Sequence, residues 1–334
     1  MNSVPEERPA DGASQERLTL AAIHAAHVRI GQYIHRTPVM SSSTLDIATG
    51  AKLYFKCENL QKAGAFKARG ATNAVFSLSD AQAERGVATH SSGNHGAALA
   101  RAAQLRNIPA YIVVPHNASR AKRAAVQRYG GKLIFCEPTL AAREAAAAQL
   151  VAETGAELIH PFDDFRVMAG QGTAAVELLE EVPTLDVILC PIGGGGLASG
   201  TAVAAKGMKP SIKVIGTEPA GADDAARSFK SGERLEMQAP HTIADGLRGS
   251  LSQRTFTTIS QHLDDIVTVS EEAIVTAMRT IWEVMKLVIE PSAAVPYAAL
   301  IEGKINLQDK RAGIILSGGN LDLNELPWRP SAAG

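Results

Sequence analysis

Apolar positions along the chain follow two alternating patterns. Short runs rich in β-branched residues alternate with alanine-rich segments of helical spacing, the first of which begins near residue 18. The runs with strand character are 52–58, 86–91, 109–115, 131–137, 185–192, 212–218, 265–270 and 312–318. The later segments with helical spacing are 94–106, 119–129, 141–154, 168–181, 197–206, 271–286 and 292–303. Several strand runs are apolar almost throughout, which is typical of a parallel sheet covered by helices, so an α/β fold is predicted.

The turns that follow predicted strands are where an open parallel sheet binds its ligands. In CPIGGGGLASG (190–200) a buried strand leads into four consecutive glycines and then a helix. Amides of successive glycines can surround an anion and the helix dipole adds to the attraction, so this turn is predicted to bind phosphate. A flexible glycine loop without a ligand is the alternative. The spacing matches neither the dinucleotide fingerprint nor a P-loop, so a nucleotide is not the first expectation.

Two further turns carry polar groups at predicted strand ends. THSSGNHGAALARAA (89–103) gathers Ser91, Ser92, Asn94 and His95 at the start of a helix. These groups suit a bound carboxylate, although capping of the helix is the favoured interpretation when the turn is taken alone. In ILSGGNLDL (315–323), Ser317 ends an apolar run before two glycines, where the alternative is a simple tight turn.

One lysine stands out beside these turns. In QKAGAFKARGATNAVF (61–76), Lys67 lies between an aromatic and a small residue at the predicted start of a helix. An exposed lysine in a surface ion pair is the ordinary alternative. A predicted phosphate-binding turn, a predicted carboxylate-binding turn, the hydroxyl of Ser317 and the amine of Lys67 are hard to explain independently, and together they indicate one binding site.

Composition limits the partners of this site. Lys plus Arg (33) nearly cancel Asp plus Glu (34) in a chain of 334 residues, so no large field of one sign can attract nucleic acid or an anionic membrane. Cys57, Cys136 and Cys190 show no metal or redox spacing, which indicates buried thiols in a reducing compartment, and a cytoplasmic location is expected. The first seventeen residues lack the character of a signal or transit peptide, and no run is long enough to span a membrane. A small-molecule partner is therefore expected.

The motifs FKARG, SSGNHG, GGGGL and LSGGN resemble those of the fold type II pyridoxal-phosphate enzymes. Within that class the chain is similar to serine racemase and the short serine/threonine dehydratases, including 3-hydroxyaspartate dehydratases, from about residue 18 to 328. PAYIVVP, AGQGTAAVELL, TIADGL and MKLVIEPS extend the similarity. The resemblance implies a tryptophan synthase β-like fold, with two open parallel-sheet α/β domains, the cofactor between them, and a homodimer. It places a large domain at 1–75 and 164–334, a small domain at 76–163, and a flexible tail at 1–17.

The resemblance also assigns roles toward pyridoxal 5'-phosphate. Lys67 would bond to the aldehyde, Asn94 would contact the phenolic oxygen, and Ser317 would face the ring nitrogen. Phe66 would pack on the ring, and the glycine turn would hold the phosphate. The cofactor-binding residues are thus Phe66, Lys67, Asn94, Gly193, Gly194, Gly195, Gly196, Leu197 and Ser317.

The implied reaction is α,β-elimination from L-serine, L-threonine or 3-hydroxyaspartate, which gives a 2-oxo acid and ammonia. Lys67 would remove the α-proton, and the substrate carboxylate would bind Ser91, Ser92, Asn94 and His95. Ser92 matches the opposite-face acid/base of racemases, so racemisation of serine or aspartate is the alternative, and carboxylate binding alone is a second role for Ser92. A cofactor-holding protein without turnover and a β-replacement enzyme are less favoured, because Lys67 and Ser92 are both present and the SSGNHG loop differs from that of β-replacement enzymes.

Substrate choice depends on two arginines in this interpretation. Arg143 aligns with an arginine that can reach the distal carboxylate of a dicarboxylate, and Arg248 could lie on the same rim. A guanidinium facing the β-carbon would favour 3-hydroxyaspartate over threonine. Either arginine could instead be a solvated surface charge.

A divalent-cation site is implied by GTEPAGADD (216–224). Its ligands would be the carboxylates of Glu218 and Asp224 and the carbonyl of Ala222, hard oxygens that suit Mg²⁺, Ca²⁺ or Mn²⁺. Acidic turns are common, so the spacing alone predicts little. Nucleotide activation is not expected, because Ala97 and Val284 replace the glutamine and arginine that help to bind ATP in serine racemase.

Overall fold

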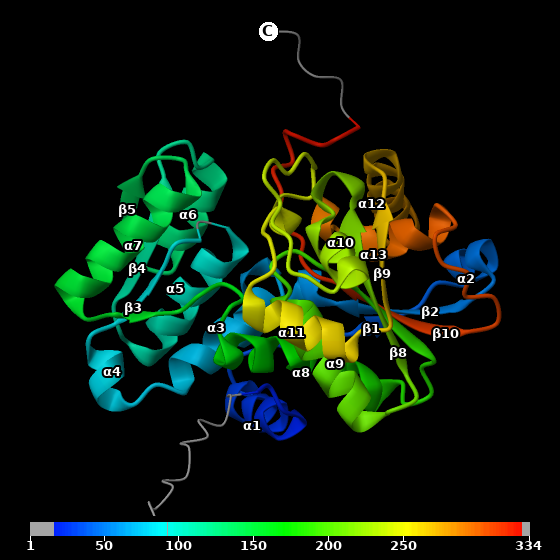
Figure 1. The fold of residues 1–334 in the computed structure, drawn as a ribbon, viewed down its shortest axis with the longest axis horizontal. Helices are drawn as coiled ribbons and strands as arrows, with labels where there is room; N and C mark the ends of the chain where they lie inside the picture. The colour runs from blue at the N-terminus through cyan, green and yellow to red at the C-terminus, as the bar shows by residue number, and fades with distance from the viewer. Residues whose placement is uncertain (1–16, 92, 329–334) are drawn as a thin grey trace, which may run out of the picture.

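The computed structural model describes residues 17–91 and 93–328, and these form two sheets (Figure 1). One sheet has six strands in the order β1-β2-β10-β7-β8-β9, and the other has four in the order β5-β4-β3-β6. All neighbouring strands are parallel except β1 and β2. The strands are β1 (Val39–Met40), β2 (Lys52–Cys57), β3 (Val87–Thr89), β4 (Ala110–Pro115), β5 (Lys132–Cys136), β6 (Glu157–Leu158), β7 (Val187–Pro191), β8 (Lys213–Pro219), β9 (Asp265–Val269) and β10 (Arg311–Leu316). The predicted α/β fold with two parallel sheets is confirmed.

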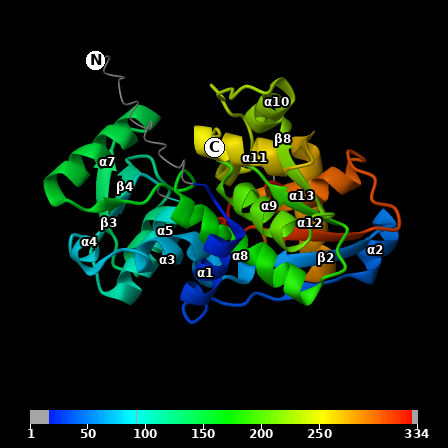
Figure 2. The same cartoon turned by 60° about the horizontal axis from the view of Figure 1, so that its bottom comes forward.

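Helices connect and cover these strands. They are α1 (Leu20–Ile30), α2 (Ser43–Thr49), α3 (Lys67–Phe76), α4 (Asp80–Glu84), α5 (Asn94–Arg106), α6 (Arg120–Arg128), α7 (Leu140–Thr154), α8 (Phe165–Glu181), α9 (Gly196–Met208), α10 (Asp224–Ser231), α11 (Gln253–His262), α12 (Glu271–Met285) and α13 (Pro291–Ile301). Figure 1 shows α5, α6 and α7 around the four-stranded sheet, and Figure 2 shows α1 beside α8 at the centre of the molecule. The predicted division at 75/76 and 163/164 falls in the last turn of α3 and at the N-cap of α8, and it stays a prediction.

Both faces of the six-stranded sheet are buried. Along β10, Ile314 packs into an apolar cluster with residues of α12 and α13, whereas the next residue, Ile315, packs into a cluster with residues of α8, α9 and α11. Successive strand residues point to opposite faces, so a strand covered on both sides must be apolar throughout. This explains why the central strand runs show no polar alternation in the sequence.

Glycines let three helices pack backbone against backbone. A Cβ on Gly170 of α8 would lie 2.5 Å from the Cα of Gly70 in α3, and a Cβ on Gly172 would lie 2.7 Å from the carbonyl oxygen of Gly200 in α9. Neither position has room for a side chain. Helix α8 thereby fixes α3, which begins at Lys67, relative to α9, which begins in the glycine turn.

Arg69, which follows Lys67 closely in the sequence, belongs to a fully buried charge cluster. Its guanidinium donates to both carboxylate oxygens of Glu58 and to both of Glu177, at 2.7–2.8 Å. The ammonium of Lys56 also donates to Glu177, at 2.7 Å. The two positive charges of Lys56 and Arg69 balance the two negative charges of Glu58 and Glu177, so no buried charge is left unpaired. Because Arg69 is the third residue of α3, the cluster also fixes the start of this helix near Lys67. Within the described ranges, no helix is both long and apolar enough to cross a membrane.

Candidate active site

Lys67, Ser317 and the glycine turn meet at one edge of the six-stranded sheet. Strands β2, β10 and β7 are neighbours, and the segments that follow them lie together. The amide of Phe66 donates to the carbonyl oxygen of Ser317 at 3.0 Å, and Ala65 forms a β-bridge with Gly318. The lysine and the lone hydroxyl, 250 residues apart in the sequence, are therefore adjacent, as expected at the carboxyl edge of a parallel sheet.

The amine of Lys67 lies in a poorly solvated position. Its Nζ donates to the carbonyl oxygen of Pro161 at 2.7 Å and lies 5.1 Å from the centre of the Phe66 ring. Burial lowers the pKa of Lys67 from 10.5 to about 8, and the charge of Glu290 acts in the opposite direction. A substantial fraction of the amine is therefore neutral near pH 8, which a lysine nucleophile or base requires.

The glycine turn leaves no room for side chains. A Cβ on Gly194 would overlap the Phe162 ring, and a Cβ on Gly193 would lie 2.9 Å from the carbonyl oxygen of Gly246. Gly195, the N-cap of α9, has φ +84°, a conformation that favours glycine. Among the described residues, the amides of residues 193–197 find no hydrogen-bond acceptor. Free amides at a helix N-terminus fit the phosphate of the expected cofactor.

The residues predicted to bind a carboxylate lie at the start of α5. Gly93 is its N-cap and, having no side chain, gives no side-chain capping bond. Asn94 is the first helical residue and Ser91 is partly buried just before the turn, whereas Ser92 lies outside the described residues. The polar side chains described at this helix start are thus not used as its cap.

His95 is buried in the first turn of α5. Its Nε2 lies 3.2 Å from the carbonyl oxygen of Ile159, and its Nδ1 has no partner among the described residues. Burial, together with the charge of Lys67, holds the pKa of His95 well below 6.5. The imidazole is therefore neutral at physiological pH and can offer a hydrogen bond without adding charge.

Two residues that sequence reasoning missed meet Asn94. Its amide nitrogen donates to Glu290 Oε1 at 3.0 Å and Oε2 at 3.2 Å, and its oxygen accepts from Asn320 Nδ2 at 2.9 Å. Burial raises the pKa of Glu290 from 4.5 to about 7. The available signal was a single acid in the apolar run LVIEP, directly before a proline that begins a helix.

The segment 160–163 was also missed. Pro161 accepts the bond from Lys67, and the Phe162 ring covers the glycine turn at Gly194. His160 Nδ1 holds the segment by accepting from the amide of Asp163 at 2.8 Å, and burial lowers the pKa of His160 to about 4. No motif marks this stretch, because its function depends on contacts with segments far away in the sequence.

The two arginines differ in their surroundings. The charge of Arg143 helps to lower the pKa of His90, at the end of β3, after the larger effect of burial. Within the described residues, the Nε of Arg143 is buried without a partner. Arg248 instead donates from Nε and Nη2 to the carbonyl oxygen of Thr242, at 3.1 and 2.6 Å. Arg143 therefore keeps hydrogen-bonding capacity for a ligand, whereas the Arg248 guanidinium is bound within its own turn.

The predicted metal ligands gather in the loop between β8 and α10. Glu218, Ala222 and Asp224 are all buried. Burial and the nearby charge of Asp224 hold the pKa of Glu218 well above 4.5, and burial raises that of Asp224 to about 6. Among the described residues neither carboxylate forms a salt bridge, and backbone amides donate to both: Ala225 and Ala226 to Glu218, and Leu251 to Asp224. The described residues contain no group of three or more His, Cys, Asp or Glu side chains that could hold a metal by themselves, so a carbonyl oxygen would have to take part. Two buried carboxylates without a salt bridge, in the same loop as the carbonyl of Ala222, fit a hard divalent cation.

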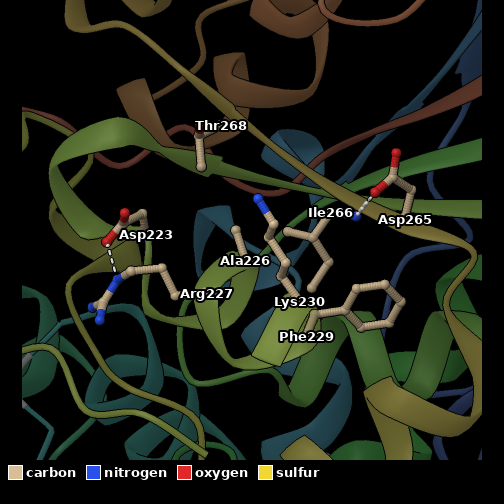
Figure 3. Close-up of a pocket in the computed structure, with 8 residues that line it drawn as sticks. All are labelled: Asp223, Ala226, Arg227, Phe229, Lys230, Asp265, Ile266 and Thr268. Atoms are coloured by element: carbon tan, nitrogen blue, oxygen red, sulfur yellow. Dashed lines mark hydrogen bonds and ion pairs between the residues drawn. The ribbon is translucent and has the colours of Figure 1, made fainter. Parts of the chain in front are cut away.

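A surface hollow of about 430 Å³ lies elsewhere, between α10 and β9 (Figure 3). Figure 3 shows Arg227 directed toward Asp223, with a bond of 2.8 Å, while Lys230 and Asp265 lie farther along the wall. The hollow contains none of the predicted catalytic or cofactor-binding residues. It is distinct from the candidate active site.

Comparisons with known proteins agree with this geometry. The family described as "Pyridoxal-phosphate dependent enzyme" matches residues 30–318. The beta-hydroxyaspartate dehydratase of Paracoccus denitrificans (strain Pd 1222) is 51% identical over 304 residues, 91% of this chain and 96% of that protein. A serine racemase of Arabidopsis thaliana is 51% identical over 312 residues, 92% of this chain and 94% of that protein. The crystal structure of serine racemase from Dictyostelium discoideum gives a TM-score of 0.88 at 49% identity, covering 92% of this chain and 99% of that one. The resemblance inferred from the motifs is confirmed, and the relatives include both a dehydratase and racemases.

Proposed function

The chain belongs to the family of pyridoxal-phosphate-dependent enzymes, and we propose that it is a dehydratase, or ammonia-lyase, acting on 3-hydroxy amino acids. Its substrates would be L-serine, L-threonine or 3-hydroxyaspartate, and its products a 2-oxo acid and ammonia. The observation that carries the proposal is the Lys67 amine, with its lowered pKa, on the same sheet edge as a turn of free amides.

Pyridoxal 5'-phosphate supplies an electron sink for an amino acid bound to it. The amides of residues 193–197 would hold its phosphate, Asn94 its phenolic oxygen, and Phe66 one face of its ring. Ser317 would face the ring nitrogen. A neutral hydroxyl cannot keep that nitrogen protonated as a carboxylate would, and the weaker electron withdrawal suits elimination better than storage of a carbanion.

The side chains around Lys67 divide the remaining tasks. The neutral Lys67 amine would take the α-proton, because its lowered pKa makes the free base available near neutral pH. Ser91, Ser92, Asn94 and His95 would bind the α-carboxylate. His95 is neutral, so it would orient the carboxylate by a hydrogen bond without placing a second positive charge beside Lys67.

Racemisation of serine or aspartate is the second candidate, and the 51% identity to a serine racemase favours it. The two reactions differ in the fate of the α-carbon after Lys67 has taken its proton. In racemisation, Ser92 would return a proton to the opposite face. In dehydration, the β-hydroxyl would leave first.

Arg143 supports a dicarboxylate among the 3-hydroxy substrates. Its unpaired Nε and its position beside His90 would allow it to bind a distal carboxylate at the small-sheet side of the site. The identity to a protein named beta-hydroxyaspartate dehydratase supports the same choice. Serine and threonine lack this second carboxylate and would not gain from Arg143.

A substrate panel tests this assignment. L-Serine, L-threonine and the four stereoisomers of 3-hydroxyaspartate are compared for 2-oxo acid release and for the appearance of the opposite enantiomer, in the wild type and in Arg143→Ala. We expect kcat/KM for hydroxyaspartate to fall roughly 10- to 100-fold in the variant, because a charged hydrogen bond is lost, while serine is little affected. Arg120→Ala, on the exposed start of α6, is the matched control. Equal losses for serine and hydroxyaspartate would refute the role of Arg143.

We further propose that Glu218, Ala222 and Asp224 hold Mg²⁺, or Ca²⁺ or Mn²⁺, as a structural ion. The two buried carboxylates support this because, among the described residues, neither forms a salt bridge and only backbone amides donate to them. The ion would stabilise the loop between β8 and α10 and take no part in proton transfer.

We also propose that the enzyme works as a homodimer in the cytoplasm. Val284 and Val288 near the end of α12, together with Leu323, expose 37–58% of their surface, and an apolar subunit contact would cover such residues. The thiols of Cys57, Cys136 and Cys190 are free and buried, which suits a reducing compartment. Light scattering of the purified protein measures the oligomeric state directly, and a monomer at micromolar concentration would contradict the dimer.

A further inference from the structure

The carboxylate of Glu290 joins three segments around the candidate active site. Its two oxygens accept from the side-chain nitrogen of Asn94, at 3.0 and 3.2 Å, and one of them also accepts from the backbone amide of Asn320, at 3.1 Å. The amide of Glu290 in turn donates to the carbonyl oxygen of Gly318 at 3.0 Å. Glu290 is only 3% exposed, so these bonds are formed in a poorly solvated environment where they are strong.

These contacts fix which end of the Asn94 amide faces which neighbour. A carboxylate only accepts, so the nitrogen of Asn94 must face Glu290. The Nδ2 of Asn320 only donates, so the oxygen of Asn94 must face Asn320. An amide nitrogen carries two hydrogens, and the end that Glu290 selects can therefore still donate to a second acceptor in the site.

The network also connects the two sheets. Asn94 begins α5, which packs on the four-stranded sheet, whereas Glu290 precedes α13 and Asn320 follows β10 of the six-stranded sheet. A second bond between the two sides joins Lys122 of α6 to Asp245, at 2.7 Å. Glu290 thus holds Asn94 at the junction on which the site depends.

We propose, on the basis of the function proposed above, that Glu290 is a positioning residue that orients the Asn94 amide so that its nitrogen faces the cofactor's phenolic oxygen. Glu290 acts through Asn94 and does not itself touch the reacting atoms.

The charges that face Glu290 come from three elements. Lys67 lies at the start of α3, Asp245 lies in the turn before Arg248, and Lys122 lies in α6. Burial is the largest cause that raises the pKa of Glu290 to about 7, and Asp245 adds to it, while the Asn94 bond and Lys122 lower it. As the pH rises through 7, the carboxylate ionises and its hydrogen bonds to Asn94 strengthen.

Nuclear magnetic resonance of the side-chain amide gives a readout that needs no turnover. Full-length protein labelled with ¹⁵N-asparagine is titrated from pH 5.5 to 8.5, and Asn94 is identified as the NH₂ pair missing in Asn94→Ser. We expect this pair to shift with a midpoint near pH 7 in the wild type and to lose that transition in Glu290→Gln. A signal that does not titrate, or one that titrates equally in both proteins, would overturn the proposal.

Cofactor affinity gives the second readout. We expect Glu290→Gln to weaken pyridoxal-phosphate binding roughly tenfold or more, since the charged acceptor that holds the Asn94 nitrogen is replaced by a neutral amide that can also donate. The double variant with Asn94→Ser should bind as Asn94→Ser alone does. Losses that simply add would contradict action through Asn94. Glu271→Gln is the matched control. Glu271 begins α12, and its carboxylate also accepts from a backbone amide, that of Ile243, so this variant should leave cofactor binding unchanged.

Two further comparisons keep the outcomes separate. Glu290→Asp retains a carboxylate, so it replaces Glu290→Gln if that variant does not fold, and it should keep a titrating Asn94 signal. Wild-type protein that binds no cofactor would refute the proposed function, whereas wild-type binding with no difference in Glu290→Gln would refute only the role of Glu290.

Discussion

At the scale of single residues, the position of Lys67 determines its chemistry. A lysine at the surface is charged at physiological pH, but burial beside Phe66 lowers the pKa of Lys67 to about 8. Glu290 limits this shift, because its charge favours the ammonium form. Glu290 therefore acts both on the pKa of Lys67 and, in the role proposed above, on the orientation of Asn94.

This shift predicts the pH dependence of cofactor capture. Only the neutral amine of Lys67 can bond to an aldehyde, and a lowered pKa makes that form predominant above about pH 8. The rate at which cofactor-free enzyme takes up pyridoxal phosphate, followed by absorbance, should therefore rise with pH with a midpoint near 8. A midpoint near the ordinary lysine value of about 10.4 would contradict the buried position.

Sequence reasoning located residues whose motifs are local. Lys67, Asn94, the glycine turn and Ser317 each stand in a short pattern at a predicted strand or helix end, and the structure places the described ones at the expected ends. Glu290 escaped it because its partner Asn94 is 196 residues away. Only the fold brings such pairs together, so spacing along the chain could not show them.

At the scale of elements, the long strands were predicted well because a strand that is covered on both faces consists almost entirely of apolar residues. The elements not predicted are short or polar. Strands β1 and β6 have two residues each, helices α2 and α4 have seven and five, and α11 is a threonine-rich helix that starts at a Ser252–Thr255 capping box. Helix α10 was missed because its first residue, Asp224, belongs to the acidic segment 216–224 that was interpreted as a metal-binding turn. Packing against neighbours, rather than local propensity, stabilises such elements.

The glycine contacts between helices predict a sharp difference between two substitutions. In Gly170→Ala, the new Cβ would meet backbone atoms of Arg69 and Gly70 at 2.5–2.8 Å, which cannot move aside alone. We expect a loss of roughly 1–3 kcal/mol in the free energy of unfolding, measured by urea titration, together with weaker cofactor binding as α3 shifts. Gly31→Ala, whose nearest contact is 3.4 Å at helical φ, should be neutral or slightly stabilising. Equal stability of the two variants would contradict this packing.

The loop between β8 and α10 predicts an effect of metal removal. Chelation would leave the carboxylates of Glu218 and Asp224 buried without a counter-charge, so the melting temperature should fall with EDTA and recover with excess Mg²⁺. Glu218→Gln should lose this response. A melting temperature that is the same with and without EDTA would count against the ion.

At the scale of the whole molecule, the site draws on elements that belong to both sheets and their covering helices. The six-stranded sheet supplies Lys67, the glycine turn and Ser317, and the helix that begins at Asn94 packs on the four-stranded sheet (Figure 1). Bonds from Asn94 to Glu290 and from Lys122 to Asp245 connect the two sides. The resemblance to fold type II enzymes implied two such sheets, but the bonds between their elements required the structure.

The most direct test of the account is the identity of the lysine that binds the cofactor. Purified enzyme is incubated with pyridoxal phosphate, reduced with borohydride, digested and analysed by mass spectrometry, with Lys67→Ala treated in parallel. The account predicts a reduced adduct on the peptide that contains Lys67 and none in Lys67→Ala. An adduct on a different lysine, or an unmodified wild-type protein, would contradict it.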